Sequence, residues 1–268
     1  MVKIFRNIRQ KLAAENKVAA YLRYAVGEIV LVVFGILIAL QVNNWNENQK
    51  QKKQEITDLQ NLSIDLKKQI QRQDIYIDFE DIIIEDCKAI VAHYEQNNGF
   101  KKMDSIFPKI NDLSTRITFT NANTTLLEMI NSGEINIIDN ESLKKELMEF
   151  NQLIEGFANN TVNNNTNLVD QFVVRNVMKK SNFASFSYSK KLRSKIQENS
   201  QMNFINVKDN TLKTIAIQNL NEPKIRLELI NDVVFRNGLA ELQKSGDEML
   251  KTKATQLLKH IETELNQR

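Results

Sequence analysis

Side chains that commonly do chemistry are scarce in this sequence, which has 2 His and 1 Cys among its 268 residues. His93 and His260 have no neighbour at the spacing of a metal ligand, and only antiparallel pairing of two distant helices would bring them together. Cys87 has no disulfide partner, and its place on an apolar helical face indicates a buried, unreactive thiol. No hydrolase, zinc or phosphate-loop motif is present. The sequence therefore predicts no catalytic residue, no metal site and no cofactor.

One group of carboxylates is dense enough to be considered as a cation site. Its members lie within nine positions of one another, and the first, third and fourth would share a helix face. No histidine lies close by, and charges around a helix usually form a solvated face, so we interpret the group as solvated. The group consists of Asp78, Glu80, Asp81, Glu85 and Asp86.

For the protein as a whole, a hydrolase without a recognisable motif is the least favoured interpretation.

The elements that would have to position any site are helical. The chain is 42% hydrophobic and 26% charged, which is enough apolar material for a folded core. It has 7 Gly and 2 Pro, few for a fold that depends on tight turns. We therefore predict an all-α protein rather than an all-β fold or a zinc module.

The positive charge is concentrated at the N-terminus. The formal net charge is +3, but residues 1–24 contain six basic residues and one acidic residue, so the rest of the chain is close to neutral. A protein that binds nucleic acid usually has a basic excess over its folded body. We therefore expect no nucleic-acid partner, and residues 1–24 are predicted to be a basic cytoplasmic segment, either a solvated topology signal or a short amphipathic helix on the lipid surface.

Residues 25–42, AVGEIVLVVFGILIALQV, have the properties of a transmembrane helix. A dozen Val, Ile, Leu and Phe side chains make insertion favourable by roughly 5 kcal/mol, and eighteen residues span roughly 27 Å. A buried core helix is a less favoured alternative, and a cleaved signal peptide lacks its small-residue cleavage site. Six basic residues precede the span and three follow within about fifteen residues, so the N-terminus is predicted to be cytoplasmic and the rest extracytoplasmic.

Several residues of the span are candidates for packing and anchoring. Small side chains at four-residue steps would let another helix approach closely, although such residues are common in membrane helices. Glu28 is the only ionisable residue of the span, and its position near one end favours snorkelling over a functional role. The candidates are Gly27, Glu28, Leu31, Gly35, Ala39 and the interfacial Trp45.

A heptad pattern follows the span. Apolar residues recur at about seven-residue intervals, and no Gly or Pro lies between Gly35 and Gly99. We predict a long helix over residues 43–97, either continuous from the membrane or interrupted by a hinge in the polar stretch 43–54. The predicted seam consists of Ile56, Leu59, Leu66, Ile70, Ile77, Ile84 and Val91, with Cys87 on the same face.

Residues 98–268 are predicted to complete a helical bundle. Helices are expected from Thr124 to Asn131, from Glu141 onward, and from Pro223 nearly to the C-terminus, and residues 116–120 are expected to be extended. An asparagine-rich stretch at 159–167 indicates a bend or a solvated helical turn. The final helix is expected to bury an apolar face that includes Leu242 and to pack antiparallel to the first long helix.

The segment from Gly27 to Glu47 resembles the start of an uncharacterised family of single-pass membrane proteins from Bacteroidetes, with the pattern G-E-I-x-L-V-x-x-G-I-L-I-A-L-Q-x-N-N-W-N-E. A looser similarity covers TTLLEMINSGEINIIDNESL, residues 124–143. The resemblance implies a helical protein of unknown function, anchored in a Gram-negative inner membrane with its domain in the periplasm. It implies no catalytic residues.

Two functions remain open from the sequence. The seam and the scarcity of chemical groups favour a non-enzymatic scaffold or interaction protein, whose partners would be the lipid bilayer and either another protein or a second copy. The alternative is a periplasmic small-molecule sensor, which would need a separate cytoplasmic partner because only about 24 residues lie inside.

Overall fold

The computed structural model describes residues 18–197 and 204–267. Within these ranges the regular structure is helical, and the single β-type pairing is an antiparallel bridge between Ser185 and Asn206, so the predicted all-α class is confirmed. Internal contacts divide the chain into two units, Met1–Thr57 and Asp58–Arg268. The helix predicted for residues 43–97 thus contributes to both units. The basic segment predicted for residues 1–24 lies mostly outside the described residues.

The first unit contains the beginning of helix α2 (Val18–Asn97). Every residue from Ile29 to Val42 is exposed, although most of these side chains are apolar. This helix is long and apolar enough to cross a membrane. The sequence allowed a hinge in the polar stretch 43–54, but this stretch is helical throughout and lies within α2.

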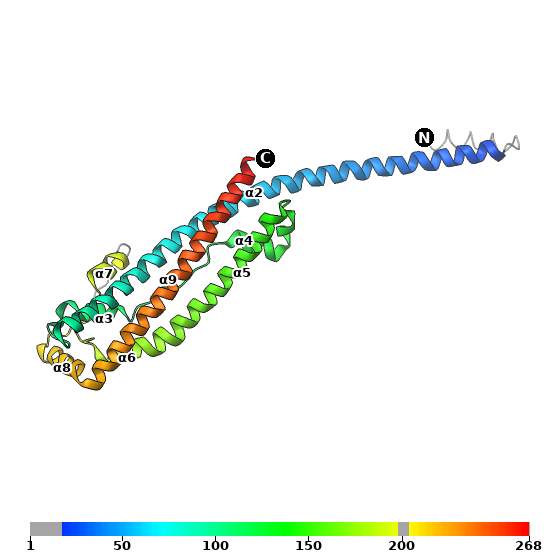
Figure 1. The fold of residues 1–268 in the computed structure, drawn as a ribbon. Coiled ribbons are helices and arrows are strands. Elements are labelled where there is room, and N and C mark those ends of the chain that lie inside the picture. Colours follow the sequence, from blue (N-terminus) through cyan, green and yellow to red (C-terminus); the bar gives the residue numbers. More distant parts are fainter. Residues whose placement is uncertain (1–17, 198–203, 268) are drawn as a thin grey trace. The chain divides into compact units, whose positions relative to one another are not determined.

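The second unit is a bundle of three long helical stretches, which Figure 1 shows side by side. The first is α2 from Asp58 onward. The second is α5 (Glu141–Asn163), continued by the π-helix η3 (Asn164–Val174) and by α6 (Arg175–Lys180). The third is α9 (Pro223–Asn266).

Ion pairs define how α2 and α9 are aligned. The α2 members of these pairs are spaced by seven residues, and their partners come earlier and earlier along α9. The two helices are therefore antiparallel, as the sequence predicts. The pairs are Lys67–Glu262, Asp74–Lys251, Asp81–Lys244 and Lys88–Glu241.

Helix α5 is also antiparallel to α9. Asn140 Nδ2, just before α5, donates to Glu264 at 2.8 Å, and Thr161 Oγ1, near the end of α5, accepts from Gln243 Nε2 at 3.0 Å. Residues later in α5 thus contact residues earlier in α9. Because α2 and α5 are both antiparallel to α9, they are parallel to each other.

Short helices close the bundle. Beyond α2 lie η1 (Met103–Ser105) and α3 (Phe107–Asp112), and before α5 lie α4 (Thr124–Ser132) and η2 (Glu134–Ile137). Between α6 and α9 are α7 (Lys190–Gln197) and α8 (Asn210–Asn221).

Local signals place most of the helix ends where the sequence predicts them. Helix α2 ends at Asn97, before Asn98 and Gly99 with φ of 45° and 143°. Gly133, with φ of 81°, ends α4, and the Asn140 side chain accepts from Leu143 N–H at the start of α5. Pro223 begins α9.

One expectation about α9 is wrong. Leu242 is 72% exposed, because the buried face of α9 passes instead through Leu239, Gln243 and Leu250. Residues 116–120, expected to be extended, form no helix and pair with no strand, and Thr120 N–H donates to Tyr76 Oη of α2. The asparagine-rich stretch 159–167 is helical and mostly solvated, as one of its two predicted alternatives has it, and it contains the transition from α5 to η3.

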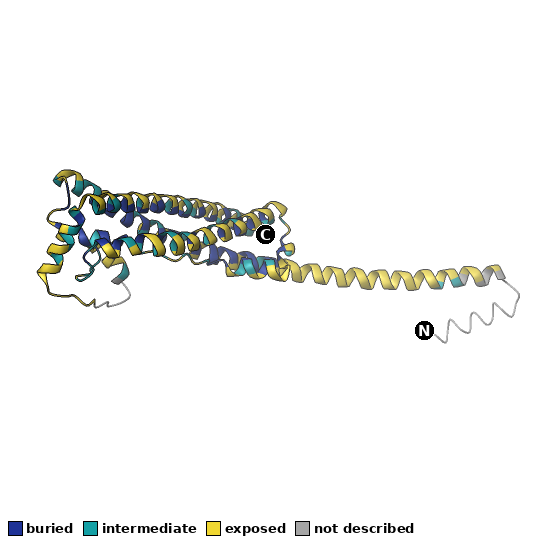
Figure 2. Ribbon diagram, turned by 90° about the horizontal axis from the view of Figure 1, so that it is seen from below, coloured by how far each residue is buried: buried dark blue, intermediate teal, exposed yellow. Residues whose placement is uncertain are grey.

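The core of the bundle contains two apolar clusters. One lies around Leu59, Leu126 and Leu143, and the other around Ile83, Phe100 and Val177. Figure 2 shows the buried residues on the inner sides of the long helices. The packing is tight at Gly246, where an added Cβ would lie 2.2 Å from Phe157 Cε2.

Candidate functional site

The predicted packing strip of the first unit is open along the helix. Gly27, Leu31, Gly35 and Ala39 are all exposed, and apart from the neighbouring helix backbone, a Cβ added at Gly27 or Gly35 would meet no described atom within 4 Å. Trp45 is 64% exposed and Glu28 is half-buried. The strip is thus available for contact with another helix.

Three of the seven predicted seam residues of α2 are buried, namely Leu59, Leu66 and Ile84, whereas Ile56, Ile70, Ile77 and Val91 are only half-buried. Gln73, Glu80 and Cys87 continue the seven-residue register of Leu59 and Leu66 and are buried too. A second line of buried residues, which the sequence did not predict, consists of Leu62, Gln69, Tyr76, Ile83 and Ile90.

A layer of polar side chains, which we call the polar belt, lies between the two apolar clusters. Arg236 Nη1 lies 3.3 Å from Glu80 Oε2, with both side chains almost fully buried. Asp247 and Gln73 are also buried, and among the described residues neither Asp247 Oδ1 nor the Gln73 amide has a hydrogen-bond partner. The belt consists of Gln73 and Glu80 of α2, Thr161 of α5, and Arg236, Gln243 and Asp247 of α9.

Burial decides which of these groups are charged. It raises the pKa of Glu80, and the charge and hydrogen bond of Arg236 oppose this rise. Burial and, second, the charge of Glu80 raise the pKa of Asp247 to about 8. Burial also raises the pKa of Cys87 to about 12, so its thiol remains protonated and unreactive at neutral pH. The belt therefore holds a proton on Asp247 at neutral pH.

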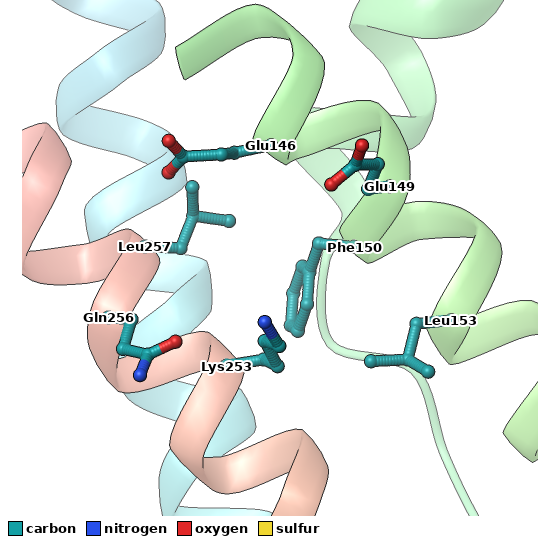
Figure 3. Close-up of a pocket in the computed structure, with 7 residues that line it drawn as sticks. All are labelled: Glu146, Glu149, Phe150, Leu153, Lys253, Gln256 and Leu257. Atoms are coloured by element: carbon teal, nitrogen blue, oxygen red, sulfur yellow. The ribbon is translucent and has the colours of Figure 1, made fainter. Parts of the chain in front are cut away.

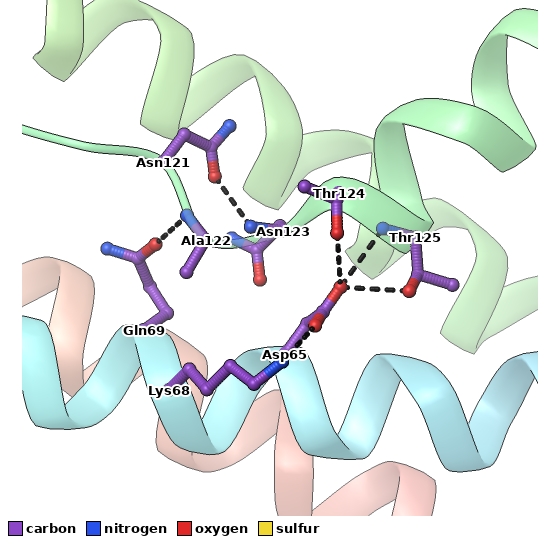
Figure 4. A network of polar contacts seen from close by, with 8 residues as sticks. All are labelled: Asp65, Lys68, Gln69, Asn121, Ala122, Asn123, Thr124 and Thr125. Atoms are coloured by element: carbon purple, nitrogen blue, oxygen red, sulfur yellow. Dashed lines mark hydrogen bonds and ion pairs between the residues drawn. The ribbon is translucent and has the colours of Figure 1, made fainter.

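A second polar network holds the start of α4 against α2 (Figure 4). Asp65 Oδ2 accepts from Thr125 N–H at 3.0 Å, Thr125 Oγ1 at 2.8 Å and Thr124 Oγ1 at 3.1 Å. Burial alone would raise the pKa of Asp65, but these bonds and one from Lys68 bring it below its ordinary value. Asp65 thus binds the N-terminus of α4 as a charged cap supplied from another helix.

The same face of α2 binds the irregular segment that precedes α4. Gln69 Oε1 accepts from Ala122 N–H at 2.8 Å, and Tyr76 Oη accepts from Thr120 N–H at 2.9 Å. Thr124 and Thr125 of this network belong to the Thr124–Leu143 region that carries the looser family resemblance, and the sequence did not predict the network. The threonine pair at the start of α4 is a local sign of a cap, but the carboxylate that uses it is 60 residues away.

A buried pair of carboxyl groups lies where α3 meets α2. Asp112 hydrogen-bonds to Asp86, and Ser189 N–H donates to both carboxyl oxygens of Asp112, at 3.0 and 3.2 Å. Lys109 pairs with Asp86. Burial and, second, the bond with Asp86 raise the pKa of Asp112 to about 8, so this carboxyl carries a proton that it can donate to Asp86.

The acidic group of α2 is only in part the solvated face that we predicted. Asp78, Asp81 and Glu85 are exposed or half-buried, and each pairs with a lysine. Glu80 and Asp86 are buried instead, since they face the interior of the bundle. Helix α7 supplies two of the lysines, Lys195 and Lys191, so these pairs attach it to α2.

The two histidines are not brought together. His93 Nε2 lies 2.6 Å from the Lys101 carbonyl oxygen, and His260 Nδ1 lies 2.9 Å from Glu146 Oε2. The pairing of Lys67 with Glu262 puts His260 at the opposite end of the bundle from His93. Among the residues that the structure describes, no group of three or more His, Cys, Asp or Glu side chains is arranged to bind a metal.

A groove lies between α5 and α9 on the surface of the bundle. Its volume is about 360 Å³, and Figure 3 shows the side chains that line it. Buried Phe150 and Leu257 contribute apolar surface, while Glu146, Glu149 and Lys253 supply charges. The groove can accept a small apolar group that also carries a positive charge.

Comparison with known proteins gives one match. A model described as a family of unknown function, DUF6090, matches residues 28–208, whereas no curated protein and no solved structure matches the chain. The matched region begins at Glu28 and contains Asp65, Gln73 and Glu80, but it ends before α9, which supplies Arg236 and Asp247. Because this match covers most of the 268 residues, the chain belongs to the DUF6090 family of unknown function.

Proposed function

We propose that this protein is a single-pass membrane protein whose helical bundle binds other proteins and does not catalyse a reaction. The observation that carries the proposal is the run of exposed residues from Ile29 to Val42. In water this apolar surface would be costly, whereas transfer of its side chains to a bilayer is favourable by roughly 5 kcal/mol. The surface is therefore best explained by a lipid environment.

The charge distribution supports an orientation. Six basic residues precede the span and three follow it closely, so the N-terminus lies in the cytoplasm and the bundle on the other side of an inner membrane. In a Gram-negative cell that compartment is the periplasm.

Membrane extraction tests the anchor. We expect the full-length protein to stay in the membrane pellet after alkaline carbonate treatment, and Leu31→Arg/Leu37→Arg to be released, because each central arginine costs about 3 kcal/mol. Ile64→Arg is the matched control, since Ile64 is also exposed but belongs to the bundle. Release of the wild-type protein by carbonate would refute the anchor. A periplasm-dependent phosphatase fused after Arg268 should be active, and an inactive fusion that is stably produced would contradict the orientation.

The open strip of small residues supports binding through the span. Apart from the neighbouring helix backbone, Gly35 has no described atom within 4 Å of an added Cβ, so a second helix can approach its backbone closely. In native membranes, crosslinking should capture the protein with a neighbour, and Gly35→Leu should weaken this capture. Val33→Leu, on the opposite helix face, is the control. A protein that crosslinks to nothing would contradict the interaction role.

The groove between α5 and α9 favours a second candidate function, a periplasmic sensor that signals through a separate cytoplasmic partner. Its volume lies at the lower end of the range for small-molecule sites, and its carboxylates favour an amine with an apolar body. Thermal unfolding of the full-length protein with a panel of small amphiphilic amines tests this alternative. A stabilisation that is lost in Glu149→Gln would support the sensor, and no stabilisation by any amine would exclude this ligand class.

A further inference from the structure

The outer face of α9 carries an uncharged stripe that no other described part of the bundle covers. Its residues are separated by 4, 3, 4, 4, 3 and 4 positions, which makes two 11-residue repeats. Because 11 residues are close to three helical turns, the residues stay on nearly the same side of the helix. The apolar members are 44–72% exposed, and none of the members is charged. The stripe consists of Leu227, Asn231, Val234, Gly238, Leu242, Ser245 and Met249.

The stripe is widened by apolar side chains of α9 and of the neighbouring helix. Phe172 of η3 packs edge-on against Phe235, with 6.1 Å between the ring centroids, and the two rings are 56% and 40% exposed. We call this surface the neutral face. Its large apolar residues are Phe172, Leu227, Val234, Phe235, Leu242 and Met249.

We propose that the neutral face pairs two copies of this chain, an inference that rests on the proposed protein-binding function and names its partner. A two-fold contact brings the same patch of both copies together, and an uncharged patch does so without like-charge repulsion. By contrast, the side of α9 that faces α2 carries ion pairs along much of its length. Exposed Glu241 and Glu248 lie beside the stripe on α9, but no member of the stripe itself offers a charge to a charged partner.

The area of the neutral face matches what a stable dimer needs. Its six large side chains are 40–72% exposed, which amounts to roughly 650 Å² per copy, against the roughly 800 Å² that each partner buries in a standard interface. Isolated exposed apolar residues are common, but a contiguous patch of this size usually marks a contact surface.

A groove beside the neutral face gives the second copy a place for a side chain. It lies between α2 and α9, has a volume of about 270 Å³, and is lined by Val91, Ala92 and Val234, with Lys88 and Glu95 among the other lining residues. Its apolar part can accept an apolar side chain of the second copy.

The test is the mass of the full-length protein in detergent, measured by light scattering over a range of protein-to-detergent ratios. The wild type should be a dimer. Val234→Glu/Leu242→Glu should weaken dimerisation at least 100-fold, because it brings four carboxylates into one apolar contact. Ile64→Glu/Ile75→Glu is the matched control, since both isoleucines are exposed on α2. Circular dichroism and thermal unfolding of each variant establish that the fold is intact.

The outcomes separate this inference from the proposed function. A dimer lost in Val234→Glu/Leu242→Glu and kept in the α2 control and in Gly35→Leu supports pairing through the neutral face. A wild-type monomer overturns it, as does a dimer that survives the two glutamates. If Gly35→Leu alone abolishes the dimer, the protein still binds a partner through its span, so the proposed function stands while the neutral-face inference fails.

Discussion

Two regions of the bundle bury a carboxylate in opposite ways. At the start of α4, Asp65 is 5% exposed and accepts three hydrogen bonds from Thr124 and Thr125, and its pKa lies below the ordinary value. In the polar belt, Asp247 is 1% exposed, its Oδ1 has no donor among the described residues, and its pKa is raised to about 8.

The difference shows that donors, not the degree of burial, decide whether a buried carboxylate stabilises this fold. Asp65 remains charged because a helix N-terminus supplies N–H and O–H groups that bind the anion. Asp247 faces a second acid, Glu80, and is easier to bury as the neutral acid. We therefore expect the contact of Asp65 with the start of α4 to stabilise the bundle. We expect the polar belt to fix which residues of α2 and α9 face each other, and to lower the stability of the fold.

The largest expected contrast in the free energy of unfolding is between Leu143, an apolar core residue of α5, and Gln73, a belt residue whose amide has no hydrogen-bond partner among the described residues. Leu143→Ala should lower the free energy of unfolding by about 3 kcal/mol, because it leaves a cavity in a fully buried cluster. Gln73→Leu should leave it unchanged or raise it, since the buried amide has no partner among the described residues. Denaturant unfolding followed by circular dichroism measures both. A loss above about 1 kcal/mol for Gln73→Leu would show that the belt amide is stabilising.

Replacement by asparagine should change the free energy of unfolding differently at Asp65 and at Asp247. Asp65→Asn should destabilise the protein by about 2 kcal/mol at pH 7, because an amide cannot accept all the bonds that Thr124 and Thr125 donate. Asp247→Asn should be neutral or stabilising, since it replaces an acid that is costly to ionise. Asp74→Asn, at an exposed position on α2, is a control for the loss of one charge. Equal losses at Asp65 and Asp247 would refute the distinction.

This contrast also marks how far the sequence could predict the structure. The ends of α2 and α4 and the starts of α5 and α9 were predictable, because a cap depends on residues within one turn, such as Asn140 or Gly133. The long apolar part of α2 and the antiparallel pairing followed from long apolar patterns. The belt did not, because an apolar pattern does not reveal that the polar residues Gln73 and Glu80 are buried, even though they fall in its seven-residue register.

Long-range partners account for the remaining errors. Asp65 caps a helix that begins 59 residues later, and Glu80 meets an arginine 156 residues away. No local spacing connects such residues. The exposure of Leu242 was missed for a related reason, because an apolar residue on an outer face has the same periodicity as one in a core until the facing helices are known.

The pH dependence of stability should separate the two regions further. Between its ordinary pKa of about 4 and its folded pKa of about 8, Asp247 holds a proton in the folded chain and releases it on unfolding. The folded state then binds more protons, so stability falls as the pH rises through this window and levels off above about pH 8. Asp112 acts in the same direction. Asp65, with its lowered pKa, loses its contribution only as the pH falls below about 4.

Unfolding at pH 5 and pH 8 measures this effect. The wild type should be more stable at pH 5 by at least about 3 kcal/mol, because Asp247 alone holds close to one extra proton in the folded state over most of these three pH units, and Asp247→Asn should reduce this difference. Asp65→Asn should leave the difference between pH 5 and pH 8 intact, because Asp65 does not titrate in that window. If Asp247→Asn retains the full pH dependence, the belt does not hold the proton.

The smallest effect is expected on the solvent side of the same helices. The pair Asp74–Lys251 is 2.6 Å long, but its side chains are 53% and 41% exposed, so water and salt screen it. Asp74→Asn should therefore cost at most about 0.5 kcal/mol, and the cost should disappear in 1 M salt. A salt-independent loss comparable to that of Asp65→Asn would contradict this expectation. Charge at the surface of α2 and α9 would then stabilise the bundle as strongly as the buried cap of α4, and accessibility to water would not explain the contrast between them.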